Sequence, residues 1–343
     1  MKKKKRKIYK SSIILFVLDL LALGCLFLAY GPFTWFKNFL VTSAMSTMSH
    51  HYLARTIYSD KMIADVLNKN YLRDIKDNTN TEDINFDNED KGHYESIYEE
   101  QILKRDPGND DYKIIELDED GYHGYLTVIY DPSRIHLIFA ANPERGGQQL
   151  VDFAQENNAI VAINGSGLYY PYANKYGVKA TGVVIKDGQI YSVGEGTGWP
   201  GGLIGFTNDN VLVLTHESAT DAIAHGMRDA IEFGPFLIVN GKPAESAGNG
   251  GYGLAPRTAI AQRKDGIVLF LVVEGRSASS MGIGMDEMID LFLRYKAYNA
   301  TNLDGGGSST LVVNGELIND PRGFGYEGGR YLVNSWALMP KEN

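Results

Sequence analysis

The sequence is poor in the residues and motifs of several common chemistries. It has one cysteine, Cys25, which lies inside an apolar run, so no intramolecular disulfide can form and no thiol nucleophile exists outside that run. It contains no GxxxxGK[ST], no GxGxxG directly after a strand-like run, no HExxH and no GxSxG. An extracytoplasmic protein without disulfides suits a bacterium better than a secretory pathway that oxidises thiols.

Positive charge is also scarce beyond the first ten residues. Those ten carry seven lysines and arginines and no acid, so removing them from the net charge of −9 leaves −16 for the remainder. Nucleic acid is therefore not expected as a partner of the folded part. The seven histidines show no metal-ligand spacing once the adjacent His50 and His51 are set aside. The sequence predicts no metal site and no cofactor, and it leaves a divalent cation open.

An apolar run from Ile13 to Phe33 follows the basic tail and is interrupted mainly by Asp19. Its length is enough to cross a bilayer, and the basic flank predicts a cytoplasmic N-terminus with the C-terminal bulk outside the cell. We therefore expect a cytoplasmic tail at 1–10 and an uncleaved, single-pass signal anchor in the cell membrane at 11–33. The alternative is lipoprotein processing at Cys25, which the apolar residues that continue after it disfavour.

The remaining chain divides by composition into three parts. Residues 34–70 predict a juxtamembrane helical segment, in which Ser59 is the N-cap of a helix with one apolar stripe. Residues 71–97 are polar and acidic and almost free of branched aliphatics, which is typical of a solvated linker. The folded domain is then expected to span 98–343.

The folded domain shows mostly strand-like patterns. Short apolar runs, two-residue turn signals and a few helix-like segments alternate along it, and we expect an α+β fold with a largely antiparallel or mixed sheet and a few inserted helices. The expected strands include 134–140 and 159–163, the turns are Asp187-Gly188, Asn240-Gly241, Asp265-Gly266 and Asn314-Gly315, and the helices lie at about 148–157, 218–228 and 285–296.

The stretch from Asn302 to Thr310 is expected to follow the last helix, at about 285–296, and to precede an apolar strand, and it combines one carboxylate, three consecutive glycines and three hydroxyls. Consecutive glycines are kept where backbone approaches another group closely or adopts positive φ, and their N–H groups can form an anion site. The plain alternative is a tight turn in which Asp304 caps its own backbone. Other polar loops, also placed at strand ends, favour one shared polar pocket.

Six segments together resemble the phosphodiester glycosidase family over roughly residues 110–340. They read AINGSG, FGPFLIVNGK, PRTAIAQRKDG, VVEGR, NLDGGGSST and GGRYLVNSWAL. The chain departs from the family pattern in having Asn164-Gly165-Ser166-Gly167 where Asn-Gly-Gly and aromatics are frequent, and Glu274 where aspartate is frequent. The resemblance implies an extracytoplasmic hydrolase that cleaves a GlcNAc-1-phosphodiester-like bond at the anomeric C–O, with a sugar-phosphate or cell-surface glycopolymer as substrate.

The resemblance and the chemistry of that reaction together suggest roles for the loop residues. Arginine forks hold phosphate well, and a carboxylate is needed beside the developing oxocarbenium ion as nucleophile or base. The expected catalytic carboxylates are Asp304 first and Glu274 second. The expected phosphate- and sugar-binding residues are Arg257, Arg276, Arg330, Asn164, Gly305, Gly306, Gly307 and Ser308.

Each of these roles has a structural alternative. Arg257 and Arg330 would otherwise pair with surface acids, Glu274-Gly275-Arg276 would form a turn, and Asn164 would only stabilise the turn after its strand. For the whole protein, one alternative is a non-catalytic module that binds glycan phosphate in an exopolysaccharide or teichoic-acid assembly system. A structural partner acting through 34–70 is the other, and the sequence sets no oligomeric state.

Overall fold

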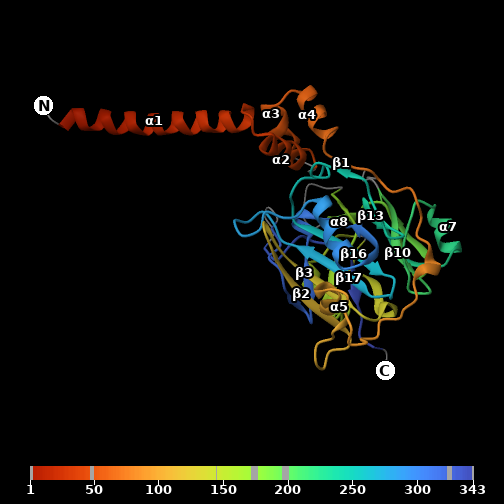
Figure 1. Cartoon of the computed structure of the whole chain (residues 1–343). Coiled ribbons are helices and arrows are strands. Elements are labelled where there is room, and N and C mark those ends of the chain that lie inside the picture. The colour runs from red at the N-terminus through yellow and green to blue at the C-terminus, as the bar shows by residue number, and fades with distance from the viewer. Residues whose placement is uncertain are drawn as a thin grey trace. The chain divides into compact units, whose positions relative to one another are not determined.

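The computed structural model describes residues 3–46, 50–143, 145–170, 177–194, 201–322 and 327–341, with side chains from residue 12 onward. The first two residues of the expected cytoplasmic tail, and the side chains of its other members, lie outside this description. The chain forms two compact units, one of residues 1–71 with 247–253 and one of 72–246 with 254–343. Each unit is described by itself below (Figure 1).

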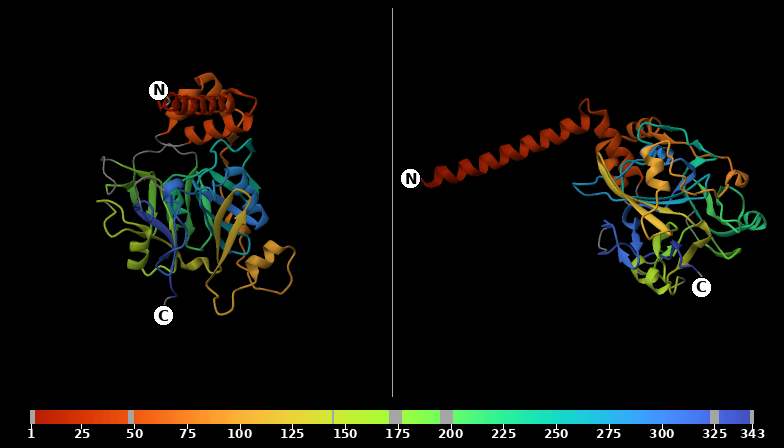
Figure 2. Two further views of the ribbon diagram at one scale, coloured as in Figure 1. Left: turned by 90° about the vertical axis from the view of Figure 1, so that its left-hand side faces the viewer. Right: turned by 60° about the horizontal axis from the view of Figure 1, so that its bottom comes forward.

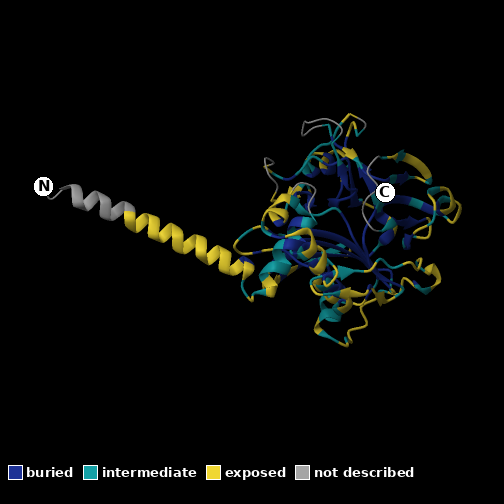
Figure 3. Ribbon diagram, turned by 90° about the horizontal axis from the view of Figure 1, so that it is seen from above, coloured by how far each residue is buried: buried dark blue, intermediate teal, exposed yellow. Residues whose placement is uncertain are grey.

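The smaller unit is helical, as the sequence predicts for its first 70 residues. Its helices are α1 (Lys3–Tyr30), α2 (Thr34–Met45), α3 (His51–Ile57) and α4 (Asp60–Leu67). Between Ser12 and Tyr30, α1 is long and apolar enough to cross a membrane, and its side chains there are almost all exposed (Figure 3). Ser59 caps α4 by accepting a hydrogen bond from the Met62 N–H, as expected.

A segment from late in the chain completes this unit. Asn249 donates from Nδ2 to Thr42 Oγ1 at 2.8 Å, and its N–H donates to Asn70 Oδ1 at 3.1 Å. Ser46 Oγ donates to the Tyr252 carbonyl at 2.9 Å. Residues 247–253 are therefore tied to α2 and to the end of the α4 segment by polar contacts that the sequence pattern does not reveal.

The larger unit contains three antiparallel sheets, which Figure 2 shows from two further directions. The seven-stranded sheet has the order β14 (Lys242–Pro243), β13 (Phe236–Val239), β18 (Ala297–Asn302), β16 (Arg257–Arg263), β17 (Val268–Val273), β3 (Tyr122–Ile129) and β2 (Tyr112–Glu119). One five-stranded sheet has the order β11 (Leu212–Thr215), β10 (Gly202–Thr207), β12 (Met227–Phe233), β8 (Val183–Lys186) and β9 (Gln189–Val193). The other has the order β20 (Glu316–Leu317), β19 (Leu311–Val313), β5 (Val161–Asn164), β21 (Asn334–Leu338) and β4 (Ile135–Phe139).

Short elements surround these sheets. The strands β6 (Leu168–Tyr169) and β7 (Lys179–Ala180) pair with each other, and β1 (Tyr71–Leu72) and β15 (Ser246–Ala247) are equally short. The helices are α5 (Ile97–Leu103), α6 (Leu150–Glu156), α7 (Ala219–Ala224) and α8 (Met285–Arg294), with 3-10 turns η1 (Thr81–Asp83), η2 (Pro132–Arg134) and η3 (Gly306–Ser308). Helix α6 packs on β5, α7 on β12, and α8 on β18 and β13.

One hydrophobic core joins all three sheets. It contains Phe270 of the seven-stranded sheet, Phe206 of one five-stranded sheet and Trp336 of the other, all fully buried. The rings of Phe206 and Trp336 meet edge to face with centroids 5.5 Å apart. Because a single core holds layers of sheet with a few helices outside them, the α+β prediction with mostly antiparallel strands is confirmed.

The four two-residue turn signals all lie between paired strands. At Asp187, Asn240 and Asn314 the residue and the glycine after it both have positive φ, as a type I′ turn requires. Asp265-Gly266 differs, because only the glycine has positive φ and the strands β16 and β17 are joined by a longer loop. In that loop, the Asp265 carboxylate accepts hydrogen bonds from Nε and from one terminal nitrogen of Arg263.

Two sequence-based expectations differ from the structure. The Asp304 loop directly follows a strand, β18, rather than the helix α8. The sequence pattern does not reveal this strand, because AYNATN has no apolar run, although Asn299 and Thr301 are fully buried in it. The range 71–97 is not a solvated linker, because most of it belongs to the larger unit. The N–H of Thr79 donates to Leu214 O at 3.0 Å, and that of Asn85 donates to Lys264 O at 2.8 Å.

Asp229 on β12 is a fully buried carboxylate that links two of the sheets. It accepts from Lys186 Nζ at 3.1 Å and from Arg228 Nε at 3.1 Å, and His136 of β4 lies 3.6 Å from it. Burial alone would raise the pKa of Asp229, but these three partners and the Asp187 N–H lower it well below its usual range. The carboxylate is therefore charged and stabilises the fold in that form.

Substitution of Asp229→Asn should lower the free energy of unfolding by about 3 kcal/mol, because it leaves the half-buried cations Lys186 and Arg228 without their counter-charge. Since the folded pKa lies below the unfolded one, the loss should be complete above about pH 4 and shrink as the pH falls further. Denaturant titrations at several pH values measure it. The matched control is Asp187→Asn, which removes a 74% exposed partner of the same Lys186 and should cost less than about 1 kcal/mol. Equal losses in the two variants would contradict this account.

Candidate active site

The Asp304 loop connects β18 to β19 and approaches the start of β16 closely. The Gly306 N–H donates to Pro256 O at 2.8 Å, and Gly306 has a φ of +64°. A Cβ atom at Gly305 would lie only 2.9 Å from the same Pro256 oxygen. These glycines are therefore required by close backbone approach and by positive φ, which are the two reasons the sequence suggests for them.

Asn164 fixes this loop from the end of β5. Its Nδ2 donates to the Asp304 carbonyl at 2.6 Å. Its Oδ1 accepts from Thr258 Oγ1 at 2.7 Å and from the Thr310 N–H at 3.2 Å. The side chain is fully buried and joins three chain segments, so it holds Asp304 in place from behind. This geometry favours a positioning role for Asn164 over a substrate contact.

Three arginines surround the same loop. The Cδ atom of Arg257 lies 3.6 Å from the position of a Cβ on Gly305, and a terminal nitrogen of Arg276 lies 3.0 Å from that of a Cβ on Gly306. Arg330 acts electrostatically on both Asp304 and Arg276. The structure thus brings together Asp304 and three cations that are distant in sequence.

The ionisation of Asp304 reflects this setting. Burial raises the pKa of Asp304 above its usual range, while the charges of Arg330 and Arg257, the nearby Ser308 hydroxyl and the Gly305 N–H partly offset that rise. Within the described part of the chain, Asp304 Oδ2 and Ser308 Oγ are both buried without a partner in hydrogen-bond geometry. The carboxylate therefore keeps an unused acceptor and an elevated proton affinity.

The arginines themselves are crowded by positive charge. Partial burial of the guanidinium and the charge of Arg330 lower the pKa of Arg276, although the residue as a whole is exposed, and its backbone has a φ of +59°. Arg276 donates from one terminal nitrogen to the Arg322 carbonyl at 3.1 Å. The Arg330 Nε is buried and has no hydrogen-bond partner among the described residues. Such a pair of neighbouring cations is a favourable place for a bound anion.

The backbone donors of the glycine run contribute less than the sequence suggests. The Gly306 N–H is already bonded to Pro256, and the Gly305 N–H acts on the Asp304 carboxylate. An anion nest that uses Gly305 and Gly306 is therefore not formed in this conformation. The loop is shaped to carry Asp304, and the positive charge comes from arginine side chains on other segments.

Glu274 directly follows β17 and lies beside another loop. Its Oε1 accepts from the Asp320 N–H at 2.8 Å, and its charge helps to raise the pKa of Tyr125, after burial of that ring. Because the Arg276 guanidinium bonds to the Arg322 carbonyl, Glu274 and Arg276 both brace the segment 320–322. The structure gives Glu274 a definite supporting contact, and its expected role in catalysis stays a prediction.

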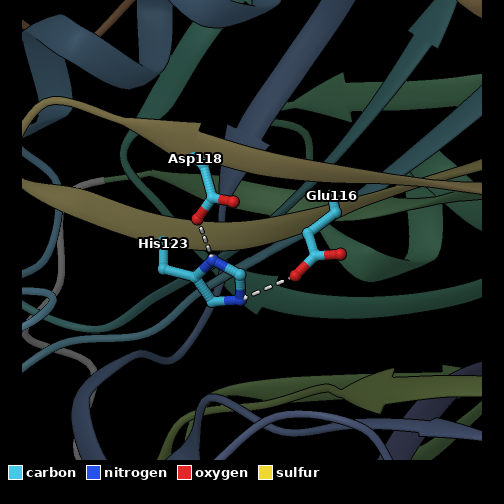
Figure 4. Close-up of side chains that lie close together, drawn as sticks. All are labelled: Glu116, Asp118 and His123. Carbon is cyan, nitrogen blue, oxygen red and sulfur yellow. Dashed lines mark hydrogen bonds and ion pairs between the residues drawn. The ribbon is translucent and has the colours of Figure 1, made fainter.

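A separate cluster that the sequence did not predict lies on the hairpin of β2 and β3 (Figure 4). Glu116, Asp118 and His123 place three potential metal-ligand atoms within 4.8 Å of one another. His123 Nδ1 lies 2.7 Å from Asp118 Oδ1, and Nε2 lies 3.1 Å from the Tyr125 hydroxyl. Asp118 and His123 face each other across the strands, so the signal was cross-strand register rather than sequence spacing. Glu116 and Asp118 are exposed, and His123 contacts both of them within this surface cluster.

Two threonines in the site were also missed as individual residues. Thr258 and Thr310 are buried and donate to Asn164, and each lies inside a segment that carries the family resemblance. The sequence features that could have indicated them are the position of Thr258 directly after Arg257 and that of Thr310 at the end of the Asp304 loop. Their partners became visible only when the strands were paired.

Comparison with known proteins identifies the family of this chain. The sequence profile described as phosphodiester glycosidase matches residues 157–339. The uncharacterised SPbeta prophage-derived protein YomE of Bacillus subtilis is 33% identical over 180 residues, which cover 50% of this chain and 27% of that protein. The N-acetylglucosamine-1-phosphodiester alpha-N-acetylglucosaminidase of Mus musculus is 25% identical over 218 residues, or 58% of this chain and 41% of the mouse protein.

Among solved structures, the catalytic domain of the zebrafish N-acetylglucosamine-1-phosphodiester alpha-N-acetylglucosaminidase is similar in fold. The TM-score is 0.54 at 21% sequence identity, and the match covers 67% of this chain and 83% of that one. The present chain spans less than half the length of the curated relatives that it matches. The family profile nevertheless covers more than half of the chain, including β5, the Asp304 loop and all three arginines. This chain therefore belongs to the phosphodiester glycosidase family.

Proposed function

We propose that the protein is a hydrolase that cleaves a sugar-1-phosphodiester of the N-acetylglucosamine type at its anomeric C–O bond. The observation that carries this proposal is the convergence of one carboxylate, Asp304, with the cations Arg257, Arg276 and Arg330 around a single loop. A phosphate ester needs positive charge, and the reacting sugar needs a carboxylate. A module that only binds phosphate gains nothing from a buried negative charge beside its arginines.

The chemistry follows from these charges. Arg276 and Arg330 bind the phosphodiester, and their charge stabilises the negative charge that grows on the leaving oxygen when the anomeric C–O bond breaks. The electron pair of that bond departs with the phosphate, which leaves as a phosphomonoester. Asp304 stabilises the oxocarbenium-like sugar as nucleophile or as base for water, whose oxygen finally bonds to the anomeric carbon.

We further propose that α1 anchors the protein in the cell membrane, with a cytoplasmic N-terminus and an extracytoplasmic glycosidase domain. The apolar stretch Ser12–Tyr30 and the basic residues before it support this orientation. Substrates on the outer side would then be sugar phosphates or cell-surface glycopolymers. In cells from which only the wall has been removed, an added protease should digest the glycosidase domain. Protection of the domain in such cells, with digestion only after lysis, would contradict the orientation.

Incubation of the full-length chain in detergent with α-N-acetylglucosamine-1-phosphomethyl ester should release free sugar and methyl phosphate in equal amounts. Asp304→Asn should reduce this rate by at least about a thousandfold, because it removes the carboxylate from the chemistry. Saturable substrate binding without release in the wild type would instead favour the non-catalytic glycan-phosphate module. Full activity of Asp304→Asn would remove Asp304 from the reaction.

The same variant should not lower thermal stability at neutral pH. Because the folded pKa of Asp304 lies above its unfolded value, its ionisation opposes folding once the pH exceeds the unfolded pKa. Asn164 bonds to the Asp304 carbonyl, which the substitution retains. Calorimetry should therefore give Asp304→Asn a Tm equal to or above that of the wild type at pH 7, with no advantage below about pH 4. A clear loss of Tm at pH 7 would show that the charged carboxylate supports the fold.

The raised pKa also predicts the acid limb of the activity profile. If Asp304 acts as the ionised carboxylate, kcat/KM should fall at low pH with a midpoint above the ordinary aspartate value of about 3.9. Glu274→Gln is the control, and it should retain that limb whatever it does to the rate. Disappearance of the limb in Glu274→Gln would assign the titrating group to Glu274.

Arg276→Gln should raise KM for the phosphodiester by about 10- to 100-fold, as expected for the loss of a charge-assisted hydrogen bond. The control is Arg322→Gln, whose guanidinium is 54% exposed and pairs with Asp320 at 2.5 Å. Its backbone carbonyl, which accepts from Arg276, is unaffected by the substitution. KM in Arg322→Gln should stay within about twofold of the wild type. Equal effects in the two variants would indicate a general loop disturbance rather than phosphate binding.

A further inference from the structure

A cavity of about 290 Å³ lies in the larger unit and shares no lining residue with the Asp304 loop. Its lining is rich in aromatic rings and includes one cation. The lining residues include Phe139, Tyr169, Lys179, Tyr191, Ser192 and Asn334. The volume is at the small end of ligand sites, which suits a single ring.

Strand pairing places this cavity at the same end of its sheet as the candidate active site. The sheet order there is β19, β5, β21, β4, and the Asp304 loop leads into β19. Ser335 of β21 pairs with Asn164, and Asn334 pairs with Phe139, the last residue of β4. Since neighbouring strands lie about 4.8 Å apart, two strand steps separate Asn164 from Phe139 by about 10 Å. The two pairs face opposite sides of the sheet, because Asn334 and Ser335 are consecutive residues of β21, so a ligand that occupies both places would cross this edge of the sheet.

A short polar bridge joins the two places. Asn334 Oδ1 accepts from the Ser166 N–H at 2.8 Å and from its hydroxyl at 3.0 Å. Ser166 follows Asn164 by two residues, and Asn164 holds the Asp304 carbonyl. The loop 164–167 therefore lies between the reacting carboxylate and the cavity, and it fixes the position of one relative to the other.

The side chains of the cavity suit a saccharide with an acidic group. The rings of Phe139 and Tyr191 lie with centroids 4.4 Å apart at an angle of 31°. Tyr191 is 46% exposed and the neighbouring Val193 is 72% exposed, although both are apolar residues on a strand. Exposed apolar surface of this kind is typical of a ligand contact. Lys179 is the only cation in the described lining, and its ammonium can pair with a phosphate.

We propose that this cavity is a second saccharide subsite, which binds the neighbouring sugar ring of a phosphodiester-linked glycopolymer while Lys179 pairs with the phosphate of that repeat. This inference rests on the proposed function and adds to it a polymeric substrate class. A small sugar phosphate would fill the Asp304 site alone. A polymer would occupy both places at once and gain affinity from the second.

The test compares two substrates with the full-length protein in detergent. One is the small phosphomethyl ester, and the other is a synthetic trimer of N-acetylglucosamine joined by 1-phosphodiester bonds. In the wild type, KM for the trimer should be at least about tenfold lower than for the small ester. Tyr191→Ala should raise KM for the trimer about tenfold and leave KM for the small ester within about twofold.

Two further variants separate ring stacking from charge. Tyr191→Phe keeps the ring and should bind the trimer as the wild type does. Lys179→Met should reduce the salt dependence of KM for the trimer to that of the small ester, because the phosphate contact that only the trimer makes is lost. The subsite is overturned if the wild type does not prefer the trimer, or if Tyr191→Ala changes both substrates equally.

Failure of the catalytic proposal would be visible separately, as absence of sugar release from both substrates by the wild type. The subsite can then still be decided by calorimetric titration of the Asp304→Asn chain with the trimer. Weaker binding in Asp304→Asn/Tyr191→Ala than in Asp304→Asn supports the subsite. Equal affinity in the two chains overturns it.

Discussion

The arrangement of the site depends on one buried amide, that of Asn164. Its three hydrogen bonds join the end of β5, the start of β16 and both ends of the Asp304 loop. β5 belongs to one sheet and β16 to another, so this side chain connects two layers at the point where the reacting groups meet. A buried amide with all its partners is rigid, because breaking any one bond leaves a polar group unsatisfied. The precision of the site therefore comes from the framework rather than from the loop alone.

The charged groups around Asn164 interact unfavourably with one another or with their surroundings. Arg276 and Arg330 repel each other, and Asp304 is held where ionisation is unfavourable. Each of these terms opposes folding when the site is without substrate. Under the proposed function, a bound phosphodiester would add a negative charge between the arginines and relieve their repulsion. The contrast with Asp229 is instructive, since that carboxylate is fully buried but paired with cations, and it stabilises the fold.

The sequence predicted the parts of the structure that depend on local chemistry. The tight turns, the helix cap at Ser59 and the long apolar helix follow from positive φ, hydroxyl capping and hydropathy, all of which act within a few residues. It failed at β18, which carries polar residues into a central position because strands on both sides pair with its backbone. It failed also at 71–97, where backbone hydrogen bonds hold the segment together with two isolated apolar side chains, Ile75 and Ile84. Arg276 and Arg330 were identified by resemblance to a family, and their proximity depends on pairing that no local pattern contains.

The two ends of the strands serve different purposes. The turns at Asn240, Asp265 and Asn314 close one end of their hairpins, while Asn164, Asp304 and the start of β16 lie at the other. At this compact end, the Asn-Gly pairs at Asn240 and Asn314 determine strand register within two residues, while Asp265 belongs to a slightly longer loop. The open end carries longer segments whose composition does not affect that register. Proteins that share this fold can therefore change or lengthen the loops at the open end, and so bind different sugars, without altering the register of the strands.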